Sequence, residues 1–171
     1  CRRWREPDNG IWEPRGARQH HTHSKVLAWV ALDRLLAIHQ AHGLDIPVAR
    51  FVAERSAIRA EIEQHGFDLA LGAYVGAFGG DDLDASVLTM PLYGYIDGDA
   101  LRMRTTWDAV IRHLGDGALV YRYLPPEGQP DEGTFVICAF WAVECKPRAG
   151  NVAVATARFD GLHRYANDGA L

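Results

Sequence analysis

The sequence predicts an all-α protein built from pairs of helices, and three observations lead to this prediction. Segments that are apolar on nearly every face recur along the chain. Each is followed by a segment whose apolar residues form a single stripe at helical spacing. Loops containing Gly and Pro separate these segments. Inner helices covered on all sides and outer helices covered on one side fit part of a ring of helical hairpins, although a helical bundle or a solenoid would show a similar pattern.

The first pair follows an opening loop. Ser24 is expected to cap a buried helix that runs to about residue 42, where Gly43 ends it. Asp45 and Pro47 begin an amphipathic helix next to it. The stripe of this second helix consists of Val48, Phe51, Val52, Ile58 and Ile62.

The second pair starts after a loop over residues 72–82 that contains an extended piece. A short apolar helix is predicted from about residue 83 to residue 92. Asp99 is the expected cap of the outer helix that follows, and Gly115 is its expected end. The stripe of the outer helix consists of Met103, Trp107, Val110, Ile111 and Leu114.

The third pair follows a loop over residues 117–131 that is rich in Pro and Gly and contains Tyr121-Arg122-Tyr123. Glu132 stands at the start of the next helix, whose residues 135–143 are apolar on all sides. A half-exposed helix is predicted from about residue 152 to residue 165.

A carboxylic acid precedes each predicted inner helix: Glu13, Asp84 and Glu132. If the hairpins share a direction, these acids gather at one end of the ring, where the unpaired N–H groups of helix starts also lie. Asp84 is more simply interpreted as an ordinary helix cap. Trp12 and Pro14 flank Glu13, and poorly hydrated surroundings would favour the protonated form that a general acid requires. An incidental surface turn remains the alternative for this loop.

Several ordered motifs carry a resemblance to a known family. The motifs are Pro7-Asp8-Asn9-Gly10-Ile11-Trp12-Glu13-Pro14-Arg15-Gly16, Ser24-Lys25-Val26-Leu27-Ala28-Trp29-Val30-Ala31-Leu32-Asp33-Arg34, Leu83-Asp84-Ala85-Ser86, Tyr121-Arg122-Tyr123, Asp131-Glu132-Gly133-Thr134-Phe135-Val136-Ile137-Cys138-Ala139-Phe140-Trp141 and Tyr165-Ala166-Asn167-Asp168. Together they resemble glycoside hydrolase family 15, which contains glucoamylases, glucodextranases and bacterial trehalases. The resemblance covers essentially the whole chain.

The resemblance implies an (α/α)6 barrel that hydrolyses α-linked glucosides and releases glucose from a non-reducing end with inversion. It implies that Glu13 is the general acid and Glu132 the general base. An inverting enzyme needs two such carboxyl groups about 6.5–9.5 Å apart, because a water molecule must fit on the opposite face of the sugar from the acid. A separation of about 5 Å would instead indicate a retaining mechanism.

Candidate substrate-binding residues are Trp12, Arg15, Arg122 and Trp141. Trp12 adjoins the acid, and Arg122 resembles the arginine with which the family binds the terminal glucose. A structural ion pair is the alternative for Arg122. Trp141, like Trp29, lies within an apolar helix, where a role in the core is the simpler interpretation.

Composition limits the classes of partner. The net charge is −4, from 18 basic and 22 acidic residues, so nothing global favours nucleic acid or an anionic membrane. No stretch has the ~18 apolar residues of a membrane span. The three cysteines do not form a disulfide framework, which favours a reducing, cytoplasmic location.

No cofactor is expected, and neither is a metal site. His20, His21 and His23 form the only dense group of candidate metal ligands, and no matching Cys or His set follows them. The resemblance to trehalases leaves a dependence on phosphate or a divalent ion open, and nothing in these residues indicates either.

The length predicts a partial catalytic domain over residues 1–171, because six hairpins would complete the barrel and this chain supplies about three. The expected partners are therefore an α-linked glucose disaccharide or oligosaccharide and a missing N-terminal half of the same protein. The isolated piece is expected to be inactive and poorly soluble. A non-catalytic helical carbohydrate-binding or structural module, and a glycosidase of another helical-toroid family, are the alternatives.

Overall fold

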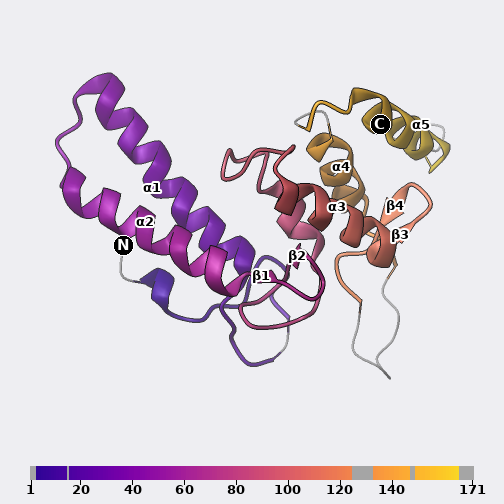
Figure 1. Ribbon diagram of the computed structural model, residues 1–171, viewed down its shortest axis with the longest axis horizontal. Helices are drawn as coiled ribbons and strands as arrows, with labels where there is room; N and C mark the ends of the chain where they lie inside the picture. The colour runs from indigo at the N-terminus through magenta and orange to yellow at the C-terminus, as the bar shows by residue number, and fades with distance from the viewer. Residues whose placement is uncertain (1–2, 15, 125–132, 147–148, 166–171) are drawn as a thin grey trace.

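The protein, described by a computed structural model over residues 3–14, 16–124, 133–146 and 149–165, is all-α, as predicted (Figure 1). Its helices are η1 (Arg3–Arg5), α1 (Thr22–His42), α2 (Val48–His65), η2 (Ala85–Thr89), α3 (Leu101–Leu114), α4 (Val136–Cys145), α5 (Val152–Leu162) and η4 (His163–Tyr165), where η marks a 3-10 helix. Two antiparallel ladders accompany them, β1 (Phe67–Asp68) with β2 (Ala73–Tyr74), and β3 (Gly115–Asp116) with β4 (Leu119–Val120).

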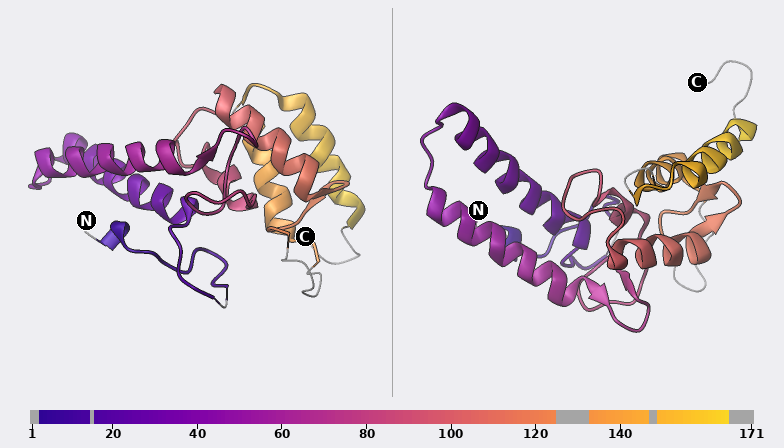
Figure 2. Two further views of the ribbon diagram at one scale, coloured as in Figure 1. Left: turned by 60° about the horizontal axis from the view of Figure 1, so that its bottom comes forward. Right: turned by 45° about the horizontal axis from the view of Figure 1, so that its top comes forward.

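The three inner and outer pairs are present as α1 with α2, η2 with α3, and α4 with α5. The long α1–α2 hairpin lies at one end of the molecule, and α3, α4 and α5 gather at the other (Figures 1 and 2). η2 connects the two groups because it packs against α1, α3 and α4. The arrangement is that of a partial ring of hairpins.

The start of α1 differs from the prediction, whereas its end does not. Ser24 lies inside the helix and does not cap it, because its hydroxyl donates to Asp8 Oδ1 at 2.7 Å. The first backbone N–H of the helix, that of Thr22, is instead satisfied by the carbonyl of Gly76 at 2.9 Å. Gly43 ends α1 in the left-handed conformation, at φ 68°, which glycine adopts without strain.

The second outer helix, α3, has the predicted stripe and the predicted end. Met103, Trp107, Val110 and Leu114 are all buried. Gly115 follows the last residue, as expected, but Ala100 occupies the N-cap position that was assigned to Asp99. The Asp99 assignment was therefore wrong by one residue, because the chain turns once more before the helix begins.

The second inner helix is much shorter than predicted. Residues 83–92 were expected to form one helix, but only the five residues of η2 do so, and all five are buried. Pro91 lacks the N–H that would continue the ladder, which limits the helix at its C-terminal end. Asp84 caps η2, as its simpler interpretation predicted, by accepting a hydrogen bond from the backbone N–H of Ser86 at 2.7 Å.

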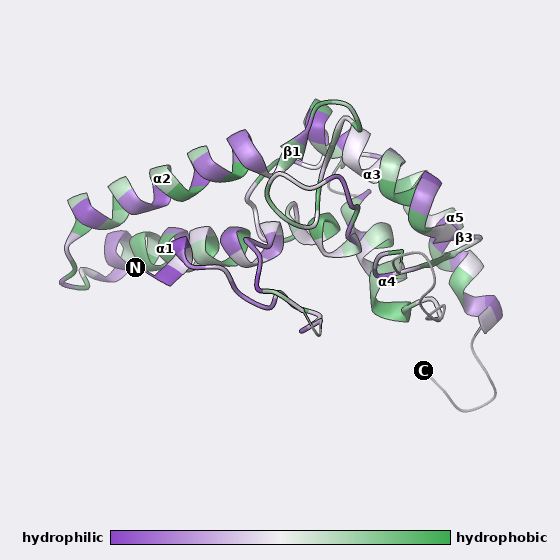
Figure 3. Ribbon diagram, turned by 90° about the horizontal axis from the view of Figure 1, so that it is seen from below, coloured by the Kyte–Doolittle hydropathy of each residue, from purple (hydrophilic) through white to green (hydrophobic). Residues whose placement is uncertain are grey.

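Helix α4 is apolar from Val136 to Val143 (Figure 3), but it is buried only in part. Cys138, Ala139, Ala142 and Cys145 face the core. At its start, Phe135, Val136 and Ile137 are 44%, 53% and 46% exposed. The described residues thus cover only about half of this part of a helix that its sequence marks as an inner one. No helix in the described ranges is both long and apolar enough to cross a bilayer.

Candidate active site

The loop that carries Trp12 and Glu13 is closed at its base by paired backbone hydrogen bonds. Asp8 and Gln19 form an isolated antiparallel bridge, with N–O distances of 2.8 and 3.0 Å. Gly10, at φ 63°, lies directly on the ring of His21, and a Cβ at this position would be 2.8 Å from that ring. Only glycine fits this turn, so the loop has a defined path over the start of α1.

Trp12 anchors the loop to a distant part of the chain. Its Nε1–H donates to both carboxylate oxygens of Asp84, at 3.0 and 2.9 Å. Asp84 is 8% exposed and also caps η2. The carboxylate therefore fixes Trp12 and the start of the second inner element together. The sequence suggested the cap, but it held no signal for the contact with Trp12.

Two further aromatic rings and an arginine surround Trp12. The ring of Phe135 meets it edge-on at 5.7 Å between centroids, and that of Trp141 lies 5.8 Å away. The guanidinium carbon of Arg122 lies 5.3 Å from the Trp12 centroid and 5.4 Å from that of Phe135. We call Trp12, Asp84, Arg122, Phe135 and Trp141 the Trp12 cluster. Three of the predicted substrate-binding residues thus lie together, although they come from three separate segments.

Glu13 occupies a constrained backbone position next to this cluster. Its φ of 47° lies in the left-handed region, which costs a non-glycine residue about 1–3 kcal/mol and persists only where neighbouring contacts hold it. The side chain is exposed, contrary to the expected poorly hydrated pocket. The physical reason is that Trp12 turns toward Asp84 and α4, so that its ring does not cover the carboxyl group.

An ion pair between a buried lysine and a partly exposed aspartate lies at the other end of the same loop. Lys25, in the first turns of α1, is 2% exposed, and its Nζ donates to the Glu6 carbonyl at 2.8 Å and to Asp8 Oδ2 at 3.3 Å. Asp8 Oδ1 accepts from the Ser24 hydroxyl and from the Gly10 N–H, both at 2.7 Å. Burial raises the pKa of Asp8, but these hydrogen bonds and the charge of Lys25 outweigh it, so the net pKa is lowered.

Lys25 was not among the residues singled out from the sequence. The available signal was a lysine in the run Ser24-Lys25-Val26-Leu27-Ala28-Trp29, since a charge on a helix expected to be buried requires a partner.

The three neighbouring histidines do not converge. His20 stacks on Phe78, and His23 packs near Tyr93. Burial lowers the pKa of His23, which the charges of Asp84 and Asp8 partly offset. In the part of the chain that the structure describes, no group of three or more His, Cys, Asp or Glu side chains could hold a metal ion.

Two predicted site residues, Arg15 and Glu132, lie outside the described residues. The separation of the Glu13 and Glu132 carboxyl groups therefore stays a prediction. Phe135, three positions after Glu132 in the sequence, is in contact with Trp12, which directly precedes Glu13.

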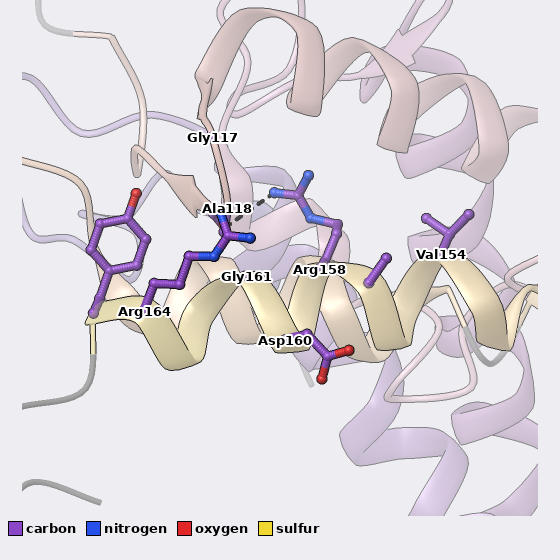
Figure 4. Close-up of a pocket in the computed structure, with 9 residues that line it drawn as sticks. Gly117, Ala118, Val154, Arg158, Asp160, Gly161 and Arg164 are labelled. Atoms are coloured by element: carbon purple, nitrogen blue, oxygen red, sulfur yellow. Dashed lines mark hydrogen bonds between the residues drawn. The ribbon is translucent and has the colours of Figure 1, made fainter.

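A pocket of about 510 Å³ lies elsewhere, between α5 and the β3–β4 turn (Figure 4). It is lined by Gly117, Ala118, Val154, Ala157, Arg158, Asp160, Gly161, Arg164 and Tyr165. Arg158 extends along its wall and donates to the carbonyl of Ala118 at 3.2 Å. This pocket shares no residue with the Trp12 cluster.

Solved structures establish the class of fold. The chain superposes on a glycosidase variant in complex with glucose with a TM-score of 0.83 and 18% identity, covering 96% of this chain and 43% of that one. A wild-type glycosidase gives a TM-score of 0.79 at 19% identity, over 92% of this chain and 41% of that one. The fold is accordingly part of the six-hairpin toroid of such glycosidases.

Sequence comparison gives the family. The pattern of glycosyl hydrolases family 15 matches residues 1–167, and the chain belongs to this family. It is 38% identical to a trehalase of Mycobacterium tuberculosis, over 96% of this chain and 25% of the relative. It is 31% identical to a trehalase of Thermoplasma volcanium, over 82% of this chain and 23% of the relative. The chain thus spans about a quarter of the length of these curated relatives.

Proposed function

We propose that residues 1–171 form part of the catalytic domain of an inverting glycoside hydrolase that acts on an α-linked glucoside. Glu13 is the general acid and Glu132 the general base. The observation that carries the proposal is the Trp12 cluster, which brings the segment before Glu13 against Arg122 and the start of α4. These are the motifs in which the family resemblance locates the acid, the base and a sugar-binding arginine.

The two carboxyl groups have separate tasks in the proposed reaction. Glu13 donates its proton to the glycosidic oxygen as the bond from C1 breaks. Glu132 removes a proton from water as the water oxygen bonds to C1 from the opposite face. At the end of the step Glu13 is deprotonated and Glu132 is protonated. The exposure of Glu13 in this chain gives it access to a substrate, and segments outside the chain would complete the cleft.

Within the site, Trp12 and Trp141 supply apolar ring surface for the sugar. Arg122 and Arg15 donate hydrogen bonds to its hydroxyl groups. A cytoplasmic location and a missing N-terminal half belong to the same proposal. No cofactor or metal has a part in it.

Trehalose is the substrate that we favour, because the curated relatives of this chain are trehalases. Inversion at one of its two α-linked rings yields one β-glucose and one α-glucose. A retaining enzyme would yield two α-glucose molecules. The two mechanisms therefore differ in the anomers that are present before mutarotation.

The test uses the full-length protein, by which we mean a polypeptide of the length of the curated relatives that contains this chain. Proton NMR should record equal α- and β-anomers in the first minutes of trehalose hydrolysis, with slower turnover of maltotriose. Glu13→Gln and Glu132→Gln should each lower kcat by about 10²–10⁴-fold. Two α-anomers would refute inversion, and no turnover of either sugar would support a non-catalytic module.

A further inference from the structure

We propose that Lys25 is a positioning residue for the general acid: it holds the loop of Glu13 in its productive place through Asp8. The inference rests on the proposed function, because it assigns Glu13 the role of acid. It adds a residue that does not touch the substrate and whose charge is buried beneath the site.

Lys25 is an unusual residue for its buried surroundings. An ammonium group that is 2% exposed is costly unless it is paired and hydrogen-bonded. Lys25 has both kinds of contact, and both lead to one segment, the carbonyl of Glu6 and the carboxylate of Asp8. The contacts that offset the burial of Lys25 therefore also hold that segment against α1.

Asp8 connects the buried lysine to the loop that carries Glu13. Asp8 joins Lys25 and Ser24 on α1 to the turn at Gly10, and its backbone closes the loop with Gln19. Glu13 lies five positions later in the left-handed conformation. The carboxyl group of Glu13 itself is exposed. Its place is therefore set by the backbone of this loop.

The anchor at Lys25 is distinct from the one at Trp12. The Trp12–Asp84 contact fixes the residue just before Glu13 to η2, whereas Lys25 fixes the base of the loop to α1. With only one anchor, the loop could pivot about the other. A shift of about 1 Å in a catalytic group can lower a rate by about 10²-fold.

The test compares two substrates that differ in their need for an acid. The glycosidic oxygen of trehalose needs a proton to leave, whereas fluoride leaves α-D-glucosyl fluoride with little help as water attacks C1. A misplaced acid therefore slows the first hydrolysis and spares the second. A general loss of structure slows both.

In the full-length protein, Lys25→Met should lower kcat for trehalose about 10–100-fold. The value of kcat for α-D-glucosyl fluoride should change less than about threefold, and KM for trehalose should be similarly unaffected. Asp8→Asn keeps an oxygen that accepts from Gly10 and Ser24 but loses the ion pair. It should also lower kcat for trehalose selectively, by a smaller factor than Lys25→Met. If Lys25→Met does not fold, as judged by circular dichroism, Asp8→Asn carries the test.

Lys146→Met is the matched control. Lys146 is also largely buried, at 12% exposed, and its Nζ lies 3.7 Å from the ring centroid of Trp107, away from the loop. This variant should lose stability without altering the ratio of the two rates.

Glu13→Gln separates the two proposals. If Glu13→Gln slows trehalose hydrolysis but spares the hydrolysis of α-D-glucosyl fluoride, Glu13 is the acid. In that case, Lys25→Met and Asp8→Asn variants that lose kcat equally on both substrates, or lose none, would overturn the role of Lys25 alone. If Glu13→Gln leaves trehalose hydrolysis intact, the proposed function fails first.

Discussion

Trp12 has two different functions at the scale of single residues. Its ring packs against Phe135 and Trp141, and we propose that it also offers apolar surface to a sugar. Its N–H donates to a carboxylate that is 8% exposed, a charge-assisted bond in poorly hydrated surroundings. The same side chain therefore both contributes to the cluster and holds in place the loop of Glu13, the proposed acid.

Trp12→Phe separates these two functions, because it keeps an aromatic ring and removes the N–H. Asp84 then loses a donor, and we expect the free energy of unfolding of the full-length protein to fall by about 1–3 kcal/mol. We also expect kcat for trehalose to fall about tenfold or more, because Glu13 is less well placed. Urea denaturation and steady-state kinetics measure the two effects.

Trp4→Phe is the control for this prediction. The Nε1–H of Trp4 donates to Glu54 Oε2 at 2.8 Å, so the chemical change is the same at a site away from the Trp12 cluster. Its kcat should equal that of the unaltered protein. Equal kcat values in Trp12→Phe and Trp4→Phe would show that the Asp84 contact has no part in placing the acid.

At the scale of elements, one carboxylate joins three of them. Glu63 on α2 accepts from the hydroxyls of Tyr74 and Tyr95, at 3.0 and 2.8 Å, and from Arg102 on α3 at 2.9 Å. Burial and the neighbouring charge of Glu63 raise the pKa of both tyrosines. This network fastens the outer helices α2 and α3 to the segments between them.

Glu63→Gln should destabilise the full-length protein by about 2 kcal/mol, because an amide cannot accept from all three donors. Glu61 is the control: it lies on the same helix, is 49% exposed, and makes only a long contact of 3.7 Å with His65. Glu61→Gln should change the free energy of unfolding by less than about 0.5 kcal/mol. Equal effects of the two substitutions in urea denaturation would contradict a structural role for the network.

The same network has a pH signature with a definite sign. Because the folded pKa of Tyr74 and Tyr95 is raised above 10.0, their contribution to stability is fully present below pH ~10 and is lost as the pH rises beyond it. Glu63→Gln removes the negative charge that helps to raise the pKa of the two tyrosines. The free energy of unfolding of this variant should therefore decline less between pH 9 and pH 11 than that of the unaltered protein.

At the scale of the whole molecule, the chain forms only part of a ring. Phe135, Val136 and Ile137 at the start of α4 are about half exposed, as are Leu27 and Ile38 on α1. Both helices belong to the inner layer, whose apolar faces a complete toroid would cover. We therefore expect segments of the same protein outside this chain to pack there.

The isolated 171-residue chain should consequently be inactive on trehalose and should bind a hydrophobic dye such as ANS. The paired substitution Val136→Ser and Ile137→Ser should lower dye fluorescence at least about twofold, because it removes adjacent members of one apolar patch. Leu69→Ser, at an isolated position that is 84% exposed, should have little effect. Turnover of trehalose by the isolated chain would show that the expectation is wrong.

The sequence by itself determined the helices and their order, because the signals for these features are local. Stripes of apolar residues at helical spacing marked α2 and α3, and Gly43 and Gly115 marked the ends of α1 and α3. Ordered motifs also sufficed for the family. Three predictions were wrong. Gly76 pairs with the first N–H of α1 in place of a Ser24 cap, and an extra turn moves the start of α3 past Asp99. Pro91 limits the length of η2.

Only the tertiary structure decided how the candidate site is held together. Asp84 and Trp12 are 72 positions apart, and Lys25 and Asp8 are 17 apart, so no local pattern specifies either contact. The direction in which Trp12 turns, and with it the exposure of Glu13, depends on rings brought by α4. A helix needs only the residues within a few turns of itself, whereas a buried charge is placed by whichever partner the complete fold brings to it.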